Sequence, residues 1–361
     1  MYALLFAGGV GQRLWPISRK NTPKQFTPII GPKSSLQLAV DRLQSLIPLS
    51  NIYISTNKRY LDILIKQFPQ ISRENFILEP VRRDLGAAVA LAFCKLYNLG
   101  IRGPIMFQWA DTYLQHDDAL IKAISVGKKL IEDNPDRIIF MGEVPRFASE
   151  NLGYIEHSEE LGRIDGEPYY GFQSWVYRPK LAECKRMVEA GNFLWNSGYF
   201  VTTVEFVVSQ YKILAPEIAT LAEEIISYTG TEAEEQKTLE LYSQMPIIHF
   251  DESFLMRLKP EQALILKVDL GWSDPGSLYG LKEALQASKG DNVTRGKVIA
   301  VETQDSLIFN EEPGKTVSVM GLDGIMVVNT NDVLLIIPKE SVRHIKNLLE
   351  ELERQGHLDV L

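Results

Sequence analysis

The sequence has few residues of the kinds that build disulfide frameworks or metal clusters. It contains two cysteines, Cys94 and Cys184, in 361 residues. This count excludes a disulfide framework and fits a reducing compartment. The five histidines show no pairing at metal-ligand spacing, which argues against zinc. No stretch approaches the length of apolar residues that spans a bilayer, and the run Met1–Gly9 is too short to do so. We therefore expect a cytoplasmic protein with no membrane partner.

An excess of positive charge is also missing. The chain has 38 Lys and Arg residues against 46 Asp and Glu residues, a net charge of −8. A net acidic chain binds polyanions poorly, so nucleic acid is not expected as a partner. Small anionic substrates stay compatible with this charge, because a few local cations and backbone N–H groups are enough to bind them. The length predicts two domains, or one large domain with an appendage.

Strands and helices alternate over the first part of the chain. Short apolar runs each precede a helical pattern, and Ser34 with Gln37 forms a capping box before one helix. The alternation predicts a parallel, doubly wound sheet. Ligands of such sheets bind beyond the carboxyl ends of the strands. The loops at 8–13 and 79–88, together with Asp111, are therefore the expected location of a site.

The pattern changes near residue 290, where short β segments separated by turn residues begin. We expect a catalytic domain over 1–290 and a small β-rich domain over 291–361 that ends in a helix. That helix, expected over 340–354, carries one apolar stripe. The stripe does not reveal whether the same chain or another copy covers it. Its members are Val342, Ile345, Leu348, Leu349 and Leu352.

A glycine-rich loop with two cations follows the first strand. The glycines within residues 8–11 let the backbone approach a ligand, so that successive N–H groups can form an anion-binding nest. Arg13 adds a planar fork for phosphate oxygens, and Lys24 adds a mobile point charge. The loop is not a Walker loop, because no Lys-Ser/Thr pair follows its last glycine. It is a poor dinucleotide fingerprint, because Leu14 stands where the third glycine would be. Taken alone, the glycine pattern leaves a purely structural role equally open.

The whole segment Ala7–Phe26, AGGVGQRLWPISRKNTPKQF, resembles the signature of the mannose-1-phosphate guanylyltransferases, members of the sugar-nucleotidyltransferase superfamily. Further family counterparts follow in order, and the likeness is weakest over 205–249. It implies an α/β fold, with a Rossmann-like doubly wound mixed sheet and a small C-terminal β-helix-like domain. The counterparts are Ile77–Pro80, Asp111, Leu152–Ile155, Trp195–Phe200, Gly271–Ser277 and the β-rich tail.

The resemblance also implies a reaction, in which GTP and mannose 1-phosphate give GDP-mannose and pyrophosphate. A phosphate oxygen of the sugar attacks the α-phosphorus in line, and cations with backbone donors supply most of the catalysis. The implied catalytic residues are Arg13, Lys24 and Asp111, and the implied Mg²⁺ ligands are Asp111 and Asp274. The implied nucleotide-binding residues are Ala7, Gly8, Gly9, Gly11, Arg13, Lys24, Glu79, Arg83, Asp84 and Gly86. The implied sugar-phosphate-binding residues are Gly153, Tyr154, Tyr177, Arg178 and Asn196.

Some of these residues also have simpler structural explanations. Asp111 could cap the segment that follows it, and Asp274 could be the N-cap of a helix that opens at Pro275. Gly86 could serve helix packing, and Trp195 is expected in the core. The β-rich tail contributes to dimerisation in the resembling family, so a homodimer is one interpretation and a packed appendage without a partner is the other.

The sequence departs from the family pattern in three places. Tyr177 and Arg178 stand where the family has Glu and Lys, so a carboxylate that would contact the sugar is missing. Thr112 follows Asp111 in place of a histidine, and residues 83–88 differ from the family's base-contacting loop. These departures leave open a nucleotidyltransferase for another sugar 1-phosphate or another NTP. A non-catalytic regulator that binds sugar nucleotides is the alternative from a different class.

Overall fold

The structure, a computed structural model, describes residues 1–9 and 11–361. It divides into two compact units, each of which has its own hydrophobic core. The first unit contains residues 1–8, 40–109 and 114–272, and the second contains residues 9–39, 110–113 and 273–361. The second unit is thus assembled from three separate segments. The domain boundary expected after residue 290 stays a prediction, because these units do not follow chain order.

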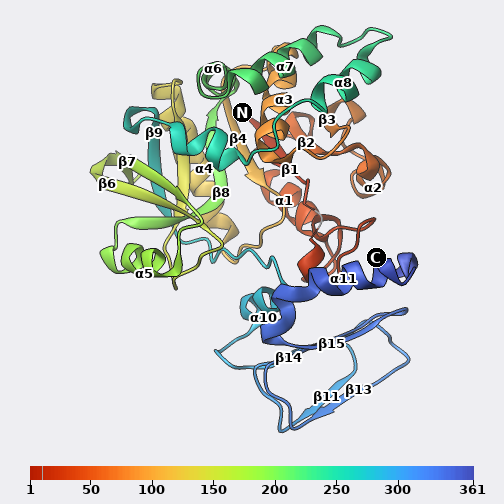
Figure 1. The fold of residues 1–361 in the computed structure, drawn as a ribbon. Helices are drawn as coiled ribbons and strands as arrows, with labels where there is room; N and C mark the ends of the chain where they lie inside the picture. Colours follow the sequence, from red (N-terminus) through yellow and green to blue (C-terminus); the bar gives the residue numbers. More distant parts are fainter. Residues whose placement is uncertain (10) are drawn as a thin grey trace. The chain divides into compact units, whose positions relative to one another are not determined.

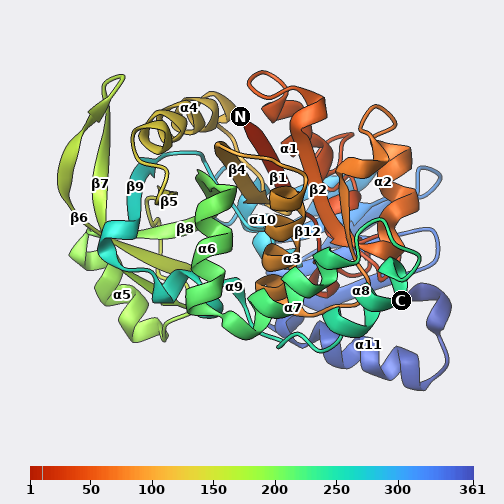
Figure 2. The same cartoon turned by 90° about the horizontal axis from the view of Figure 1, so that it is seen from above.

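A mixed sheet forms the centre of the first unit (Figures 1 and 2). Its strands are β1 (Tyr2–Phe6), β2 (Ile52–Asn57), β3 (Phe76–Glu79), β4 (Pro104–Trp109), β5 (Ile138–Glu143), β6 (Gly153–Ile164), β7 (Glu167–Tyr177), β8 (Phe193–Thr203) and β9 (Ala263–Val268). Their order is β3-β2-β1-β4-β8-β5-β9-β7-β6. Strands β1 to β4 pair in parallel, whereas β8 enters antiparallel between β4 and β5. The expected doubly wound mixed sheet is confirmed.

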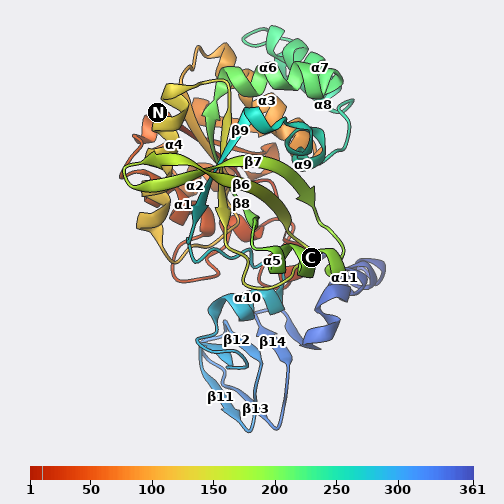
Figure 3. The ribbon, with the colours of Figure 1, turned by 90° about the vertical axis from the view of Figure 1, so that its left-hand side faces the viewer.

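Helices cover both faces of this sheet, with α3 (Asp84–Asn98) and α4 (Asp117–Asp133) on opposite sides (Figures 2 and 3). The other helices of the first unit are α2 (Leu61–Gln67), α5 (Leu181–Ala190), α6 (Val204–Leu214), α7 (Pro216–Ser227), α8 (Glu234–Tyr242) and α9 (Phe250–Ser253). Helix α3 is rich in buried alanine because it packs against α6 and α7 as well as the sheet. This packing places the start of α3 at the edge where the parallel strands end.

The core of the second unit joins the N-terminal loop to the β-rich tail. Leu14 and Trp15 share this core with Leu307 and Phe309. The elements of the unit are α10 (Leu278–Leu285), β10 (Val293–Arg295), β11 (Val298–Val301), β12 (Leu307–Asn310), β13 (Val317–Met320), β14 (Ile325–Asn329), β15 (Leu334–Pro338) and α11 (Ile345–Arg354). Helix α1 (Ser35–Leu43) begins in this unit, and the expected capping box of Ser34 and Gln37 is present before it. The parallel pairs β10–β12–β14 and β11–β13 are the stacked coils of the expected β-helix-like domain.

The C-terminal helix differs from the expectation at its start. Residues Lys339–His344 form a 3₁₀ segment, and the α-helix begins only at Ile345. Val342, Ile345 and Leu349 are buried in the core of the second unit. The same chain therefore covers most of the apolar stripe. Among the described residues, no helix has the length and apolar character needed to cross a membrane.

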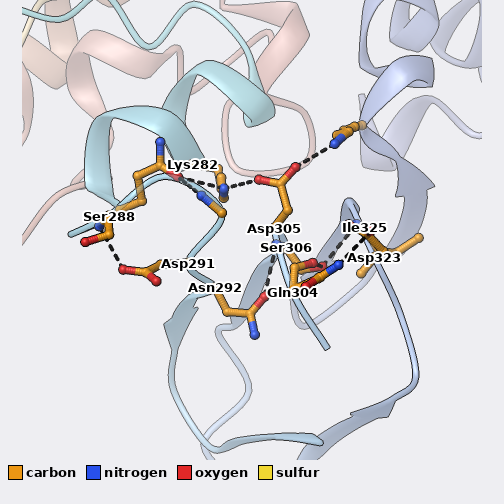
Figure 4. Close-up of polar contacts among 12 residues, drawn as sticks. Lys282, Ser288, Asp291, Asn292, Gln304, Asp305, Ser306, Asp323 and Ile325 are labelled. Atoms are coloured by element: carbon orange, nitrogen blue, oxygen red, sulfur yellow. Dashed lines mark hydrogen bonds and ion pairs between the residues drawn. The ribbon is translucent and has the colours of Figure 1, made fainter. Parts of the chain in front are cut away.

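A buried ion pair links α10 to the β-rich strands (Figure 4). The ammonium group of Lys282 is buried and pairs with Asp305, and Asp305 also accepts a hydrogen bond from Lys339 at 2.6 Å. Next to it, the backbone N–H of Ser306 donates to the Asn292 side chain at 3.1 Å. These contacts fix the position of α10, which directly follows the loop that contains Asp274.

Candidate functional site

In the first unit, Gly8 and Glu79 lie together where neighbouring parallel strands end. A side chain at Gly8 would stand 3.8 Å from the Glu79 carboxyl oxygen. Ala7, one residue before, is fixed by β2: its N–H donates to the Ser55 carbonyl at 2.8 Å and its carbonyl accepts from the Thr56 hydroxyl at 2.6 Å. Both Gly8 and Glu79 thus occupy the strand edge at which the sequence predicts a ligand.

Glu79 is a buried carboxyl group that contacts the Tyr242 side chain. Its oxygen accepts from the Tyr242 hydroxyl at 2.7 Å. Burial penalises the charged form and raises the pKa of Glu79 to about 7, although the Tyr242 hydrogen bond acts in the opposite direction. Glu79 therefore changes between a hydrogen-bond donor and an acceptor-only carboxylate close to neutral pH.

The other residues expected to contact the base are engaged with protein atoms. The Arg83 guanidinium donates to the Ser243 carbonyl, and the Asp84 carboxylate accepts from the next backbone N–H in the chain. At Gly86, a Cβ would stand 2.7 Å from the Ile248 carbonyl oxygen. The packing explanation of Gly86 therefore has direct structural support. Contact between the base and residues 83–86 stays a prediction.

Tyr154 and Asn196, two of the residues expected to contact the sugar, differ in their exposure to solvent. The Tyr154 side chain is fully buried, and its hydroxyl accepts from the Ser149 N–H at 2.9 Å and donates to the Ser149 carbonyl at 3.2 Å. Protein atoms thus satisfy the Tyr154 hydroxyl, and contact between Tyr154 and the sugar stays a prediction. Asn196 is partly exposed and its amide oxygen accepts from the Gly198 N–H at 2.8 Å. Trp195 is buried, as expected.

The remaining sugar-binding candidates lie at the end of β7. Tyr177 is half-buried and stacks on the ring of His249, with a centroid distance of 4.7 Å. Arg178 is exposed and adopts a left-handed backbone conformation, with φ of 48°. Its N–H donates to the Leu152 carbonyl at 3.2 Å, next to Gly153. A non-glycine residue in this conformation is strained, and such strain is concentrated at functional sites.

In the second unit, Lys24 connects the two aspartates expected to bind metal. Its ammonium nitrogen lies 2.8 Å from Asp111 and 3.0 Å from Asp274. A two-way backbone pairing between Tyr113 and Ser273, at 3.0 and 2.9 Å, brings the two aspartate loops side by side. The Lys24 side chain is buried, whereas the side chains of Asp111 and Asp274 are 32% and 37% exposed. The carboxylates can therefore still reach a ligand.

The charge of Lys24 is stable in this setting. Burial alone lowers the pKa of a lysine, but the charges and hydrogen bonds of Asp111 and Asp274 together raise the pKa of Lys24 above its ordinary value. Lys24 therefore stays positively charged.

The capping explanation of Asp274 is wrong, because Ser277 is the N-cap of α10 and accepts from the Gly280 N–H at 3.1 Å. Asp111 does not cap α4 either, since His116 holds that position.

The glycine loop is shaped by contacts around the same lysine. Gly11 has φ of 67°, and a Cβ there would stand 2.6 Å from the Ser18 hydroxyl and 3.1 Å from the Lys24 Cβ. The positive φ and the lack of room for a Cβ therefore both require glycine at this position. Val10, in the same loop, lies outside the described residues.

Two residues near this loop were not predicted. Gln25 donates to the Gly9 carbonyl at 2.8 Å and so fixes the loop. A Cβ at Gly276 would stand 3.2 Å from the Arg13 guanidinium, so glycine leaves room for that cation beside Asp274. Both residues stand inside segments that resemble the family, 7–26 and 271–277, and this resemblance is the signal that could have found them.

The comparisons with known proteins agree with these observations. Residues 2–289 match the family model described as Nucleotidyl transferase, and residues 296–352 match the one described as MannoseP isomerase/GMP-like beta-helix domain. The mannose-1-phosphate guanylyltransferase RfbM of Salmonella typhimurium strain LT2 is 29% identical, over 97% of this chain and 72% of that protein. Mannose-1-phosphate guanylyltransferase 2 of Escherichia coli O157:H7 is 28% identical, over 99% and 75%.

A solved structure has the same fold. It is a crystal structure from Thermus thermophilus, described as a mannose-1-phosphate geranyltransferase. It matches with a TM-score of 0.84 and 25% identity, and the match covers 98% of this chain and 99% of that one. Together, these matches confirm the resemblance inferred from the sequence and the expected β-rich C-terminal domain.

Proposed function

Because this chain belongs to the nucleotidyl transferase family, we propose that it transfers the guanylyl group of GTP to mannose 1-phosphate and releases pyrophosphate. The observation that carries the proposal is the position of Lys24, a buried cation shared by Asp111 and Asp274 beside the glycine loop. Phosphoryl chemistry needs such positioned cations and oxygen ligands. The relatives named mannose-1-phosphate guanylyltransferase support the choice of base and sugar.

The phosphates are the part of the substrate that the glycine loop, Arg13 and Lys24 would bind. The triphosphate would bind to the backbone of Gly9 and Gly11 and to the exposed guanidinium of Arg13. Lys24 would offset the negative charge that grows when a sugar-phosphate oxygen attacks the α-phosphorus and pyrophosphate leaves in line. Because Lys24 is already charged and fixed by two carboxylates, it needs no rearrangement to do so.

A divalent cation, Mg²⁺ in this proposal, fits the donor set of Asp111 and Asp274. Both are oxygen ligands, both are about one third exposed, and both contact one ammonium group. The described residues contain no group of three or more His, Cys, Asp or Glu side chains placed to bind a metal ion. A pair of carboxylates is compatible with Mg²⁺, which commonly uses one or two carboxylates together with substrate phosphates. When bound, the ion would reduce the charge repulsion between the two anionic substrates.

The base and the sugar would contact Glu79 and the residues near the end of β7. The Glu79 carboxylate, next to Gly8, would accept hydrogen bonds from the N1 and N2 groups of guanine. The sugar 1-phosphate would contact Gly153, Tyr154, Tyr177, Arg178 and Asn196, with Arg178 suited to its phosphate group. A homodimer and a cytoplasmic location also stay predictions of this proposal.

Pyrophosphate release, measured with Mg²⁺ across four NTPs and a panel of sugar 1-phosphates, tests the proposal. Release with GTP and mannose 1-phosphate would support it. Release only with another pair would keep the reaction class and change the substrates, as the departures at Tyr177 and residues 83–88 allow. No release with any pair, together with tight binding of GDP-mannose, would instead identify a non-catalytic regulator.

A further inference from the structure

Next to Tyr177, at the end of β7, the structure has two polar side chains that the proposed reaction has not used, His249 and Asp251. Tyr177 stands where the resembling family has a carboxylate for the sugar, so the chain keeps a hydroxyl there but lacks the charged acceptor. The Tyr177 ring stacks on the His249 imidazole, with a centroid distance of 4.7 Å and an interplanar angle of 19°. The stack fixes the plane of the imidazole next to a residue of the expected sugar site.

Asp251 fixes the hydrogen positions of His249. One Asp251 carboxyl oxygen lies 2.7 Å from His249 Nδ1, and the other accepts from the Trp175 indole N–H at 2.9 Å. Asp251 is only 2% exposed, so these two donors satisfy a buried carboxylate. An ionised carboxylate only accepts hydrogen bonds. The backbone N–H of Asp251 also points at Nδ1, but from 3.4 Å, whereas the carboxylate oxygen lies at 2.7 Å and needs a hydrogen between the two atoms. We therefore assign the ring hydrogen to Nδ1, which in the neutral ring leaves a lone pair on Nε2.

The cluster adjoins two further residues of the expected sugar site. A Cβ at Gly153 would stand 3.4 Å from the Asp251 carboxyl oxygen and 3.5 Å from the Asn196 Cβ. The His249 side chain is 22% exposed, so a ligand can reach it although Asp251 is buried. Nε2 of His249 makes no hydrogen bond to any described residue.

We propose that Nε2 of His249 accepts a hydrogen bond from a hydroxyl group of the sugar 1-phosphate. Asp251 is the positioning residue that keeps this nitrogen an acceptor, and Tyr177 fixes the ring plane. The imidazole thus supplies the acceptor that the family's carboxylate supplies elsewhere. This inference rests on the proposed function, because it names a substrate contact of that same reaction.

Three substitutions distinguish the role of Nε2 as a hydrogen-bond acceptor from the packing role of the His249 ring. His249→Phe keeps an aromatic ring against Tyr177 and removes Nε2. His249→Gln replaces the ring nitrogen by an amide oxygen that can still accept. Asp251→Asn keeps an oxygen for Trp175 and turns an amide N–H towards Nδ1, which moves the ring hydrogen to Nε2.

Steady-state kinetics of the full chain give the first test. We expect His249→Phe and Asp251→Asn to raise the KM for mannose 1-phosphate about tenfold, the loss of one hydrogen bond to substrate. The kcat and the KM for GTP should stay within about twofold, and His249→Gln should recover most of the lost affinity. Mannose 1-phosphates that lack one hydroxyl give the second test. One deoxy analogue should bind the wild type more weakly, yet bind His249→Phe as well as the parent sugar does.

The outcomes separate the inference from the proposed function. An active wild type whose His249→Phe variant keeps its KM for the sugar 1-phosphate overturns the inference alone. A variant that raises both KM values and unfolds at a lower temperature also overturns it, because the ring would then be structural. A wild type that releases no pyrophosphate with any NTP and sugar 1-phosphate overturns the proposed function itself.

Discussion

At the scale of single residues, Lys24 shows how position changes the role of a common side chain. Its ammonium group is buried between Asp111 and Asp274, whereas Lys20, four residues earlier in the same loop, is exposed and pairs with Glu353. Lys24→Met should lower kcat by on the order of a hundredfold or more, because a preorganised cation at the reacting phosphates is lost. Pyrophosphate release measures this loss.

Lys20→Met is the matched control for this prediction. It removes the same charge from the same loop, but at an exposed ion pair that contributes little. Its kcat should equal that of the wild type. Equal losses in the two variants would mean that only the net charge of the loop matters, and would remove Lys24 from the catalytic residues.

Glu79 gives a prediction that depends on pH. Burial raises its pKa in the folded protein to about 7, so the carboxylate that can accept from guanine forms only as the pH rises through about 7. GTP should therefore bind more tightly at pH 8 than at pH 6 in the wild type. Glu79→Gln should reduce this difference, because its amide does not titrate. Calorimetric titration of GTP into both proteins at the two pH values checks the prediction, and parallel profiles would contradict it.

The raised pKa of Glu79 also makes the stability of the folded protein depend on pH. This dependence runs opposite to that of GTP binding, because stability falls as the pH rises. A carboxyl group whose pKa is raised on folding stabilises the folded protein while it is protonated, and this contribution is lost as the pH rises from about 4.5 to about 7. Glu79→Gln carries no charge and avoids the loss. The difference in melting temperature between Glu79→Gln and the wild type should thus shift in favour of the variant between pH 5 and pH 8.

At the scale of elements, the start of α3 tests whether Gly86 serves packing or ligand binding. A Cβ at Gly86 would stand 2.7 Å from the Ile248 carbonyl oxygen, and the Tyr211 hydroxyl donates to the Gly86 carbonyl at 2.8 Å. Gly86→Ala should therefore cost about 1–3 kcal/mol of stability through overpacking. Gly314→Ala is the control, because no atom of the described residues beyond the chain neighbours lies within 4 Å of the added Cβ. A raised KM for GTP with an unchanged melting temperature would favour contact with the base instead.

Local sequence patterns predict the elements of this fold better than they predict its long-range pairing. Hydrophobic alternation and the capping box at Ser34 are properties of neighbouring residues, and the structure contains both the strands and the cap. The antiparallel insertion of β8 between β4 and β5 depends on contacts between distant segments, which no local pattern encodes.

The start of α10 is a second case, because Asp274 and Ser277 are both good N-caps by residue type. Only the turn at Gly276, whose N–H donates to the Asp274 carbonyl at 2.7 Å, decides between them.

The candidate site was predictable only in part for the same reason. The loop glycines, Arg13 and Lys24 stand in one continuous segment, so the sequence singles them out. The pairing of Lys24 with Asp274 joins residues 250 positions apart, and only the family resemblance brought both into one hypothesis. His249 and Asp251 stand at the edge of the stretch with the weakest resemblance, so the sequence does not single them out. In the structure, His249 stacks on Tyr177 and Asp251 contacts His249.

At the scale of the whole molecule, the glycine loop and the β-rich tail belong to the same folded unit. Leu14, Trp15 and Ile29 share a hydrophobic core with Leu307, Val328 and other residues of the tail. In addition, the Trp15 indole N–H donates to the Val360 carbonyl at 2.8 Å, and Arg19 forms an ion pair with Asp332 at 2.6 Å. The loop that contains Arg13 and Lys24 thus lacks a core of its own without the tail.

A chain ending at residue 290 tests this dependence. It keeps every residue that we place in the reaction, yet it exposes the apolar side chains of Leu14 and Trp15, whose burial contributes about 1.5–3 kcal/mol for each large side chain. We expect the first unit to keep its secondary structure and the shortened chain to lose pyrophosphate release, because the Lys24 segment no longer has a fixed fold. Circular dichroism and the release assay measure the two parts separately. Full activity of the shortened chain would show instead that residues 291–361 are a dispensable appendage.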